Sequence, residues 1–252
     1  MTNGQLVFYS LTTYGAGFFF SLFGRTRMAF LCMMAGLLLG SGGLILRYSL
    51  AWPMMPMHIG MHGLLCLLSV IWLCCRSGYS SGYDHVEGLL LQALIILLTT
   101  VTVLFPKDYY LPFIRSATFW SHGFLLTSIA AKGFLLMAAL RGILVFFYRH
   151  TPQTPSLTVA MFWALWGFAC LTISMFSGEI WSYLGWGTPV VWRDPAITAV
   201  MAIWLYWTAF LHLHYTRHWK QNRRAVVLIG GGLLVLVFTC LPDMGPLRLP
   251  FK

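Results

Sequence analysis

The segment from Ser177 to Thr198, SGEIWSYLGWGTPVVWRDPAIT, concentrates side chains that can do chemistry within an apolar chain. Tryptophan offers a large flat apolar face, glycine lets a backbone or a ligand approach closely, and arginine pairs with carboxylates through two parallel hydrogen bonds. Two interpretations are open. The tryptophans form a shelf for a flat molecule, or they form the aromatic belt that membrane proteins carry at the membrane surface.

Histidine and lysine side chains elsewhere are further candidates. His58 and His62 stand four residues apart, which puts both on one helical face and can chelate a metal, although no acidic or cysteine partner accompanies them. His122 opens an apolar run, and Lys132 lies about 15 Å deeper in the same run. A lysine at that depth is costly and indicates function by default, with pairing to a carbonyl or hydroxyl group as the structural alternative.

The composition indicates that these residues belong to a membrane protein. The chain of 252 residues is 59% hydrophobic and only 9% charged, whereas a soluble domain carries roughly a quarter charged residues. Because backbone groups inside a bilayer must be satisfied within their own segment, long apolar runs predict helices. We therefore expect an all-α polytopic bundle of about eight transmembrane helices, forming one integral membrane domain over residues 1–252. The expected spans are Leu6–Phe23, Met28–Leu46, Met57–Cys75, Gly88–Phe105, Phe119–Leu140, Leu157–Phe176, Ala196–Leu213 and Ala225–Leu241.

Basic residues in the short loops favour one orientation. With the N-terminus outside, eight basic residues fall in inner loops and six in outer segments. The inner group is Arg25, Arg27, Arg76, Arg149, Arg217, Lys220, Arg223 and Arg224. The positive-inside rule then predicts that both termini and a tryptophan-rich loop at 177–195 lie outside. The net charge of +10 thus reflects topology and lipid contact, and no nucleic-acid partner is expected.

The order of residues in this outer segment resembles the WWD segment of the haem-handling CcsA/ResC cytochrome c assembly proteins and, more distantly, of CcmC. The matching positions are Ser177, Gly178, Trp181, Trp186, Gly187, Trp192, Asp194, Pro195, Trp204, Leu211 and His212. The run RSATFWSHGFLLTSIAA resembles the stretch that opens the family's preceding outer helix, where His122 occupies a haem-ligand position. One family tryptophan is replaced, Arg193 is inserted before Asp194, and no histidine follows the last apolar run.

The resemblance implies a haem site. Haem b would be the substrate or transported ligand, with its iron bound by His122 or His212. The tryptophan shelf (Trp181, Trp186 and Trp192) would support the porphyrin, and Gly187 would allow close approach. Arg193 would pair with a propionate. Asp194 belongs to the family motif, but it is interpreted first as the cap of the helix that begins at Pro195. His58, His62 and Lys132 are accessory candidates.

The resemblance also implies a function in cytochrome c biogenesis. Haem would be transferred or joined by thioether bonds to apocytochrome c in the bacterial inner membrane, together with a CcsB/ResB-like or other membrane partner subunit. If the protein is an enzyme, it is expected to be a subunit of a cytochrome c haem lyase. The alternative class is a non-catalytic polytopic transporter or scaffold that keeps a degenerate tryptophan loop.

His122 and His212 are expected to serve separate stages. About 17 residues of helix separate Pro195 from His212, which corresponds to about 25 Å, whereas an imidazole binds a metal at about 2 Å. His122 would therefore ligate iron during outer presentation and His212 during inner loading. His212 and His214 point about 200° apart on a helix and cannot share one iron. Because no second outer histidine is present, the outer iron is expected to be five-coordinate, or six-coordinate through a partner's ligand or a weak one such as Met244.

Overall fold

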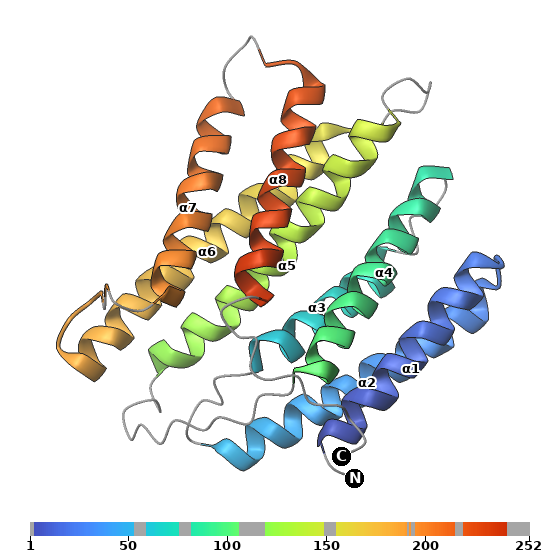
Figure 1. Ribbon diagram of the computed structural model, residues 1–252, viewed down its shortest axis with the longest axis horizontal. Coiled ribbons are helices and arrows are strands. Elements are labelled where there is room, and N and C mark those ends of the chain that lie inside the picture. Colours follow the sequence, from blue (N-terminus) through green and yellow to red (C-terminus); the bar gives the residue numbers. More distant parts are fainter. Residues whose placement is uncertain are drawn as a thin grey trace. The chain divides into compact units, whose positions relative to one another are not determined.

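A computed structural model describes residues 3–52, 59–75, 82–105, 119–148, 155–190, 192, 195–214 and 219–240. All the regular secondary structure in these ranges is helical, which confirms the predicted all-α polytopic bundle (Figure 1). The helices are α1 Asn3–Leu22, α2 Thr26–Ala51, α3 Ile59–Cys75, α4 Gly82–Leu104, α5 Phe119–Phe147, α6 Leu157–Trp186, α7 Pro195–His214 and α8 Gln221–Cys240. Five of them (α2, α4, α5, α6 and α8) are long and apolar enough to cross a membrane.

Most helix bounds lie within a few residues of the predicted spans, but α2 ends later, α4 begins earlier, and α5 and α6 end later than predicted. The segment from Ser177 to Trp186, expected to open an outer loop, continues α6 for ten residues beyond Phe176. The predicted loop 177–195 is wrong in this part. The extra turns are stabilised by packing on α5, because Ser177 lies against Gly123 and Gly178 lies against Phe124. The helix ends at Gly187, whose φ of 72° is the left-handed conformation typical of a glycine helix end.

The helices group into two compact units. Helices α1–α4 belong to the first unit and α5–α8 to the second. The sequence, read as one membrane domain, does not predict this division. The residues of the proposed haem site from His122 to His212 lie in the second unit, whereas His58, His62 and Met244 lie in the first. Met244 lies outside the described residues, so its role as a weak ligand stays a prediction.

A buried tyrosine organises the first unit. Tyr14 of α1 lies over Gly36 of α2 so closely that a Cβ on Gly36 would be 2.5 Å from the ring. The Tyr14 hydroxyl is 2.9 Å from Ser69 Oγ of α3, which itself donates to the Leu65 carbonyl at 2.8 Å. Because Ser69 has one proton to give, Tyr14 is the donor to Ser69. Close approach at glycine and hydrogen bonds between helices are the usual stabilising contacts in a bilayer.

Small residues let the helices of the second unit approach closely. A Cβ on Gly167 of α6 would lie 2.7 Å from the Leu135 side chain of α5, and one on Gly232 of α8 would collide with Ala139 of α5. Helix α7 joins through Trp204, whose Nε1 is 3.1 Å from Thr172 Oγ1 of α6. The Trp204 ring also stacks on Phe168. Helices α5 and α6, which carry the candidate site, are therefore closely packed against each other.

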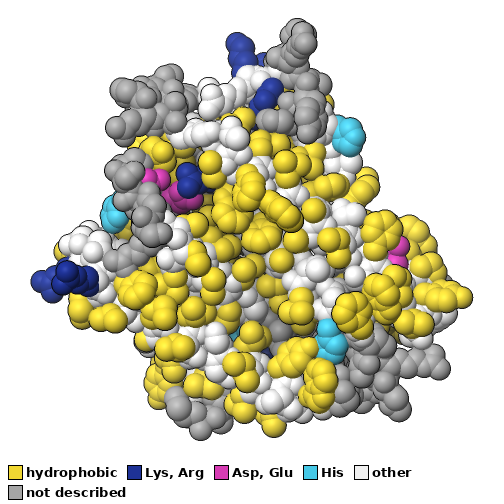
Figure 2. All heavy atoms as spheres, turned by 180° about the vertical axis from the view of Figure 1, so that it is seen from behind, with side chains coloured by type: hydrophobic (Ala, Val, Ile, Leu, Met, Phe, Trp, Pro, Cys, Tyr) yellow, Lys and Arg dark blue, Asp and Glu magenta, His cyan; other side chains and the backbone are white. Residues whose placement is uncertain are grey.

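The surface is apolar over much of its area. Figure 2 shows one face on which hydrophobic side chains predominate and charged side chains occur in small groups. Exposed large apolar residues come from every helix, for example Phe19, Leu38, Val70, Leu97, Leu126, Phe162, Leu205 and Leu233. Such a surface is stable against lipid chains and unstable against water, so it supports the membrane interpretation.

Candidate functional site

An aromatic cluster lies where the start of α5 meets the end of α6. Phe124 stacks on Trp181 with ring centroids 6.0 Å apart and an angle of 23° between the planes. Trp186 meets Trp181 edge to face, at 5.3 Å and 75°. Trp181 is half-buried, whereas Trp186 is 47% exposed. The cluster therefore has a fixed inner part and an open outer face at the end of α6.

Small residues of α6 hold the start of α5 in place. A Cβ on Gly178 would lie 3.0 Å from the Phe124 ring, and one on Gly123 would lie 3.6 Å from Ser177 Oγ. Ser174 Oγ donates a hydrogen bond to the Phe124 carbonyl at 3.0 Å. A larger side chain at position 178 would push the helices apart. Ser177 and Gly178 therefore pack against the first turn of α5 and fix its position along α6.

His122 lies in the same turn of α5 as Gly123, but it does not join the aromatic cluster of Phe124, Trp181 and Trp186. It is half-buried, in the first turn of α5. Residues two apart on a helix point about 200° apart, so His122 projects from the side of α5 opposite to Phe124. The structure therefore brings Trp181 and Trp186 together with Phe124, and leaves the His122 imidazole on the other side of the helix.

The turn after α6 is ordered by its own hydrogen bonds. The Gly187 N–H donates to the Tyr183 carbonyl at 2.9 Å, and Ser182 Oγ donates to the Thr188 carbonyl at 2.8 Å. Trp192 is 71% exposed. Arg193 and Asp194 lie outside the described residues, so pairing with a propionate and capping of α7 stay predictions. Helix α7 begins at Pro195, the residue type that favours a first helical position.

His212 is an exposed side chain near the end of α7. Its Nδ1 lies 2.8 Å from the Thr208 carbonyl oxygen. Because a carbonyl oxygen only accepts, Nδ1 carries the proton and Nε2 keeps its lone pair in the neutral ring. A backbone carbonyl that fixes the tautomer and orientation of an imidazole is a common support for a metal ligand.

The two candidate iron ligands lie at opposite ends of the second unit. The hydrogen bond between Trp204 and Thr172 shows that these two residues lie at the same height along α7 and α6. From that level, His212 lies eight residues along α7, and Ser177, which faces the first turn of α5, lies five residues the other way along α6. At 1.5 Å per residue the two ends are about 20 Å apart. One iron cannot be bound by both histidines, and Figure 1 shows the separation of the ends.

The accessory candidates do not form a metal centre in the described part of the chain. His62 is buried in α3, and His58 lies outside the described residues. Lys132 is half-buried in α5, between the buried Ala131 and Gly133. Within the described ranges, no group of three His, Cys, Asp or Glu side chains is arranged to hold a metal ion.

Sequence reasoning missed Phe124 as a site residue. The sequence could have pointed to Phe124, because it lies in the same apolar run as His122 and aromatic residues often stack across pairs of helices. The partner could not be identified, since the last ten residues of α6 were expected to be loop. The helical continuation is what places Trp181 against Phe124.

Comparisons with known proteins give partial matches. No family model matches the chain. It is 37% identical over 71 residues to "Cytochrome c biogenesis protein CcsA" of Prochlorococcus marinus (strain MIT 9312), covering 28% of this chain and 23% of that protein. It is 38% identical over 65 residues to the CcsA of Thermosynechococcus vestitus (strain NIES-2133 / IAM M-273 / BP-1), covering 26% and 20%. The matched segments thus span less than a quarter of these two relatives.

A solved structure has the same fold. The chain is similar to "Cytochrome c Heme Lyase CcmF" with a TM-score of 0.69 and 19% sequence identity, over 98% of this chain and 48% of that one. At this identity the likeness concerns the arrangement of helices alone, and the chain corresponds to about half of that protein. Together the comparisons confirm that the chain resembles the CcsA-type cytochrome c assembly proteins and has the helical fold of a polytopic membrane haem lyase.

Proposed function

We propose that this protein acts in cytochrome c biogenesis by binding haem b at the end of the second unit that carries the tryptophan shelf. The observation that carries the proposal is the contact of Phe124, Trp181 and Trp186, which fixes the WWD-like end of α6 against the start of α5. The named relatives support the biological role, because the similar proteins are called cytochrome c biogenesis proteins and a haem lyase.

The available side chains fit the chemistry of haem. Trp186 and Trp192 present exposed indole faces to an apolar planar ligand. Arg193 supplies a guanidinium for a propionate. His122 supplies an imidazole for iron, approached from the side of α5 away from Phe124. Because His122 and Phe124 lie on opposite sides of α5, the part of the porphyrin that extends past the first turn of α5 would lie on the indole faces of the shelf.

The inner end provides a second haem position. Nε2 of His212 is the ring atom available to iron, since Nδ1 donates to the Thr208 carbonyl. The exposure of His212 on α7 allows haem to reach it from the membrane. His212 serves loading at the inner end, and His122 serves presentation at the outer end. The accessory residues His58, His62 and Lys132 are assigned no step.

The chemical step belongs to haem and its acceptor. Thioether bonds form between the haem vinyl groups and the cysteines of apocytochrome c, so the chain's own contribution is to hold and orient haem. If the protein catalyses the step, it does so as a subunit of a cytochrome c haem lyase. A CcsB/ResB-like membrane subunit is the proposed partner, and the bacterial inner membrane, with both termini outside, is the proposed location.

A visible absorption spectrum tests the proposal. The protein is expressed with ample haem, purified in detergent and assayed by the pyridine-haemochrome reaction. We expect a Soret band and a haem b signature. A protein that folds but remains colourless would overturn the proposal and favour the alternative of a transporter or scaffold.

A further inference from the structure

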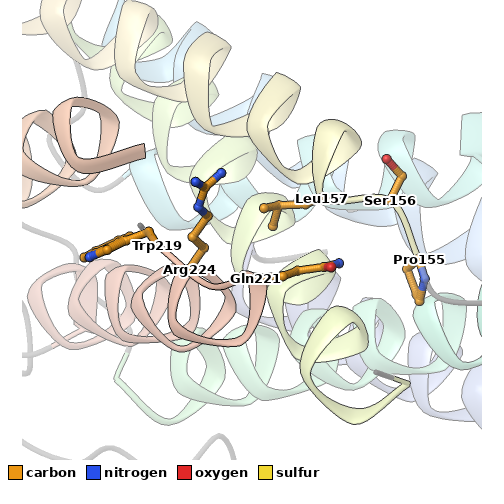
Figure 3. A pocket seen from close by; sticks show the side chains of 6 residues that line it. All are labelled: Pro155, Ser156, Leu157, Trp219, Gln221 and Arg224. Atoms are coloured by element: carbon orange, nitrogen blue, oxygen red, sulfur yellow. The ribbon is translucent and has the colours of Figure 1, made fainter. Parts of the chain in front are cut away.

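A shallow cleft lies at the end of the second unit opposite the tryptophan shelf. It has a volume of about 420 Å³ and is formed by the start of α6 and the start of α8 (Figure 3). The lining residues are Pro155, Ser156, Leu157, Trp219, Gln221 and Arg224. None of these residues belongs to the proposed haem contacts, so the cleft is a separate feature.

Local structure fixes the polar groups of the cleft. Ser156 caps α6 by accepting a hydrogen bond from the Thr158 N–H at 3.1 Å. The Lys220 carbonyl accepts from the Arg224 N–H at 3.2 Å, which starts the first turn of α8. Gln221 and Arg224 are three residues apart and therefore share a helix face. In Figure 3 the Arg224 side chain rises from that turn between Trp219 and Leu157.

The charge around the cleft favours an anion. Lys220 and Arg223 are exposed next to the half-buried Arg224. Among the described residues of the second unit, Glu179 is the only carboxylate, and it lies near the far end of α6. A guanidinium binds a phosphate through two parallel hydrogen bonds, and an indole N–H or a Gln amide can donate to the remaining oxygens.

The surroundings favour an amphiphile over a fully soluble anion. Large apolar side chains are exposed on the turns that follow the cleft, namely Val159 and Phe162 of α6 and Val226 of α8. Trp219 is half-buried, as is typical of a tryptophan at the level of lipid headgroups. A ligand with a phosphate in the cleft would lay its chains along these exposed faces.

We propose that the cleft binds the phosphodiester headgroup of an anionic phospholipid, with Arg224 as the residue that contacts the phosphate. Trp219 and Gln221 position the headgroup, and Lys220 and Arg223 add long-range attraction without direct contact. The site binds one lipid at the basic end of the second unit, independently of haem.

Native mass spectrometry of the delipidated full chain tests the proposal. Phosphatidylglycerol is added to the wild type, to Arg224→Gln and to Arg223→Gln. Both substitutions remove one charge from the same helical turn, but only Arg224 lines the cleft. We expect Arg224→Gln to weaken binding about tenfold, because a charged hydrogen-bond pair is lost. Arg223→Gln should change it less than about twofold. Equal losses in the two variants, or no loss in either, would overturn the proposal.

A second variant separates lipid binding from folding. Gln221→Glu puts a carboxylate into the first turn of α8, where the helix dipole favours it, so the thermal midpoint should hold or rise. The same carboxylate repels a phosphate, so phosphatidylglycerol binding should fall. Unchanged binding in a folded Gln221→Glu protein would contradict the proposal. This test therefore remains available if Arg224→Gln fails to fold.

Two ligand controls identify the source of the phosphate. Phosphatidylcholine tests whether the anionic character of the lipid matters, and it should bind clearly less well than phosphatidylglycerol. Inorganic phosphate at millimolar concentration should displace little phosphatidylglycerol, because it lacks the chains that contact α6 and α8. Complete displacement by inorganic phosphate, or equal binding of both lipids, would refute the proposed anionic lipid site.

Discussion

One hydrogen bond fixes the tautomer of the His212 ring, the proposed inner ligand of haem iron. Donation from Nδ1 to the Thr208 carbonyl at 2.8 Å selects the tautomer whose Nε2 can bind a metal. The acceptor is a backbone atom, so this orientation depends on the helix and not on a second side chain. His212 was a candidate from sequence, but its hydrogen bond was not predictable, because rotamers follow from local packing.

Substitution of His212 should lower haem loading without changing the outer site. His212→Gly removes the inner imidazole, so total haem per protein should fall severalfold, while the spectrum of the haem that remains keeps its shape. The haem-to-protein ratio from pyridine-haemochrome assays measures this effect. His214→Gly is the matched control, since it removes a second histidine near the same end of α7. An equal loss in both variants would indicate helix damage instead of a lost ligand.

Gln92 of α4 is a buried amide with a predictable effect on stability. It is 1% exposed, and neither its Nε2 nor its Oε1 has a hydrogen-bond partner in the described part of the chain. Burying an unsatisfied polar group costs about 1–3 kcal/mol. Gln92→Leu should therefore raise the thermal unfolding midpoint in detergent by a few degrees. A lower midpoint would contradict this expectation and show that the amide has a stabilising partner.

Close contact between helices determines which glycine substitutions lower the stability of the fold. Gly232 of α8 faces Ala139 of α5, and a Cβ there would overlap the alanine side chain. Gly232→Ala should destabilise the second unit by about 1–3 kcal/mol through overpacking. Thermal unfolding measures the effect. Gly185→Ala is the control, because a Cβ at Gly185 meets nothing within 4 Å. Equal midpoints for the two variants would refute the tight α5–α8 contact.

The exposed part of the tryptophan shelf should matter for haem and not for insertion. Trp186→Ala combined with Trp192→Ala removes two exposed indoles, which leaves the Phe124–Trp181 stack intact. We expect bound haem to be lost while membrane-inserted protein is retained, as measured by absorbance and immunoblot. If the tryptophans are only belt residues, expression should fall and haem per protein should stay constant.

The helices were largely predictable, whereas the contacts of the site were not. Bilayer thickness constrains span length, so apolar runs located α1–α8 to within a few residues at most ends. The polar residues Ser177 and Glu179, with Gly178 between them, suggested a loop. They remain helical because Gly178 packs on Phe124, a tertiary contact that no local pattern reveals. The division into two units was also missed, since no linker-like composition marks the boundary.

At the scale of the whole molecule, the proposed path of haem follows from the lengths of helices. About 20 Å separates the level of His212 from that of His122 within the second unit. The cleft at Arg224 lies at the start of α8, at the end of this unit opposite the tryptophan shelf. In the proposed function the basic end serves lipid contact and haem loading, and the opposite end serves presentation. This order of stages distinguishes the proposal from a single haem site bound by both histidines.

Imidazole rescue of His122→Gly tests the two-stage order. Haem-loaded wild type and variant are compared by visible absorption, before and after addition of millimolar imidazole. We expect the variant to lose the spectrum of the outer haem while it keeps inner haem, and imidazole to restore that signal by filling the vacated position. His212→Gly should leave that signal unchanged in shape. A bis-histidine spectrum that disappears equally in both single variants, without rescue by imidazole, would contradict the two-stage account.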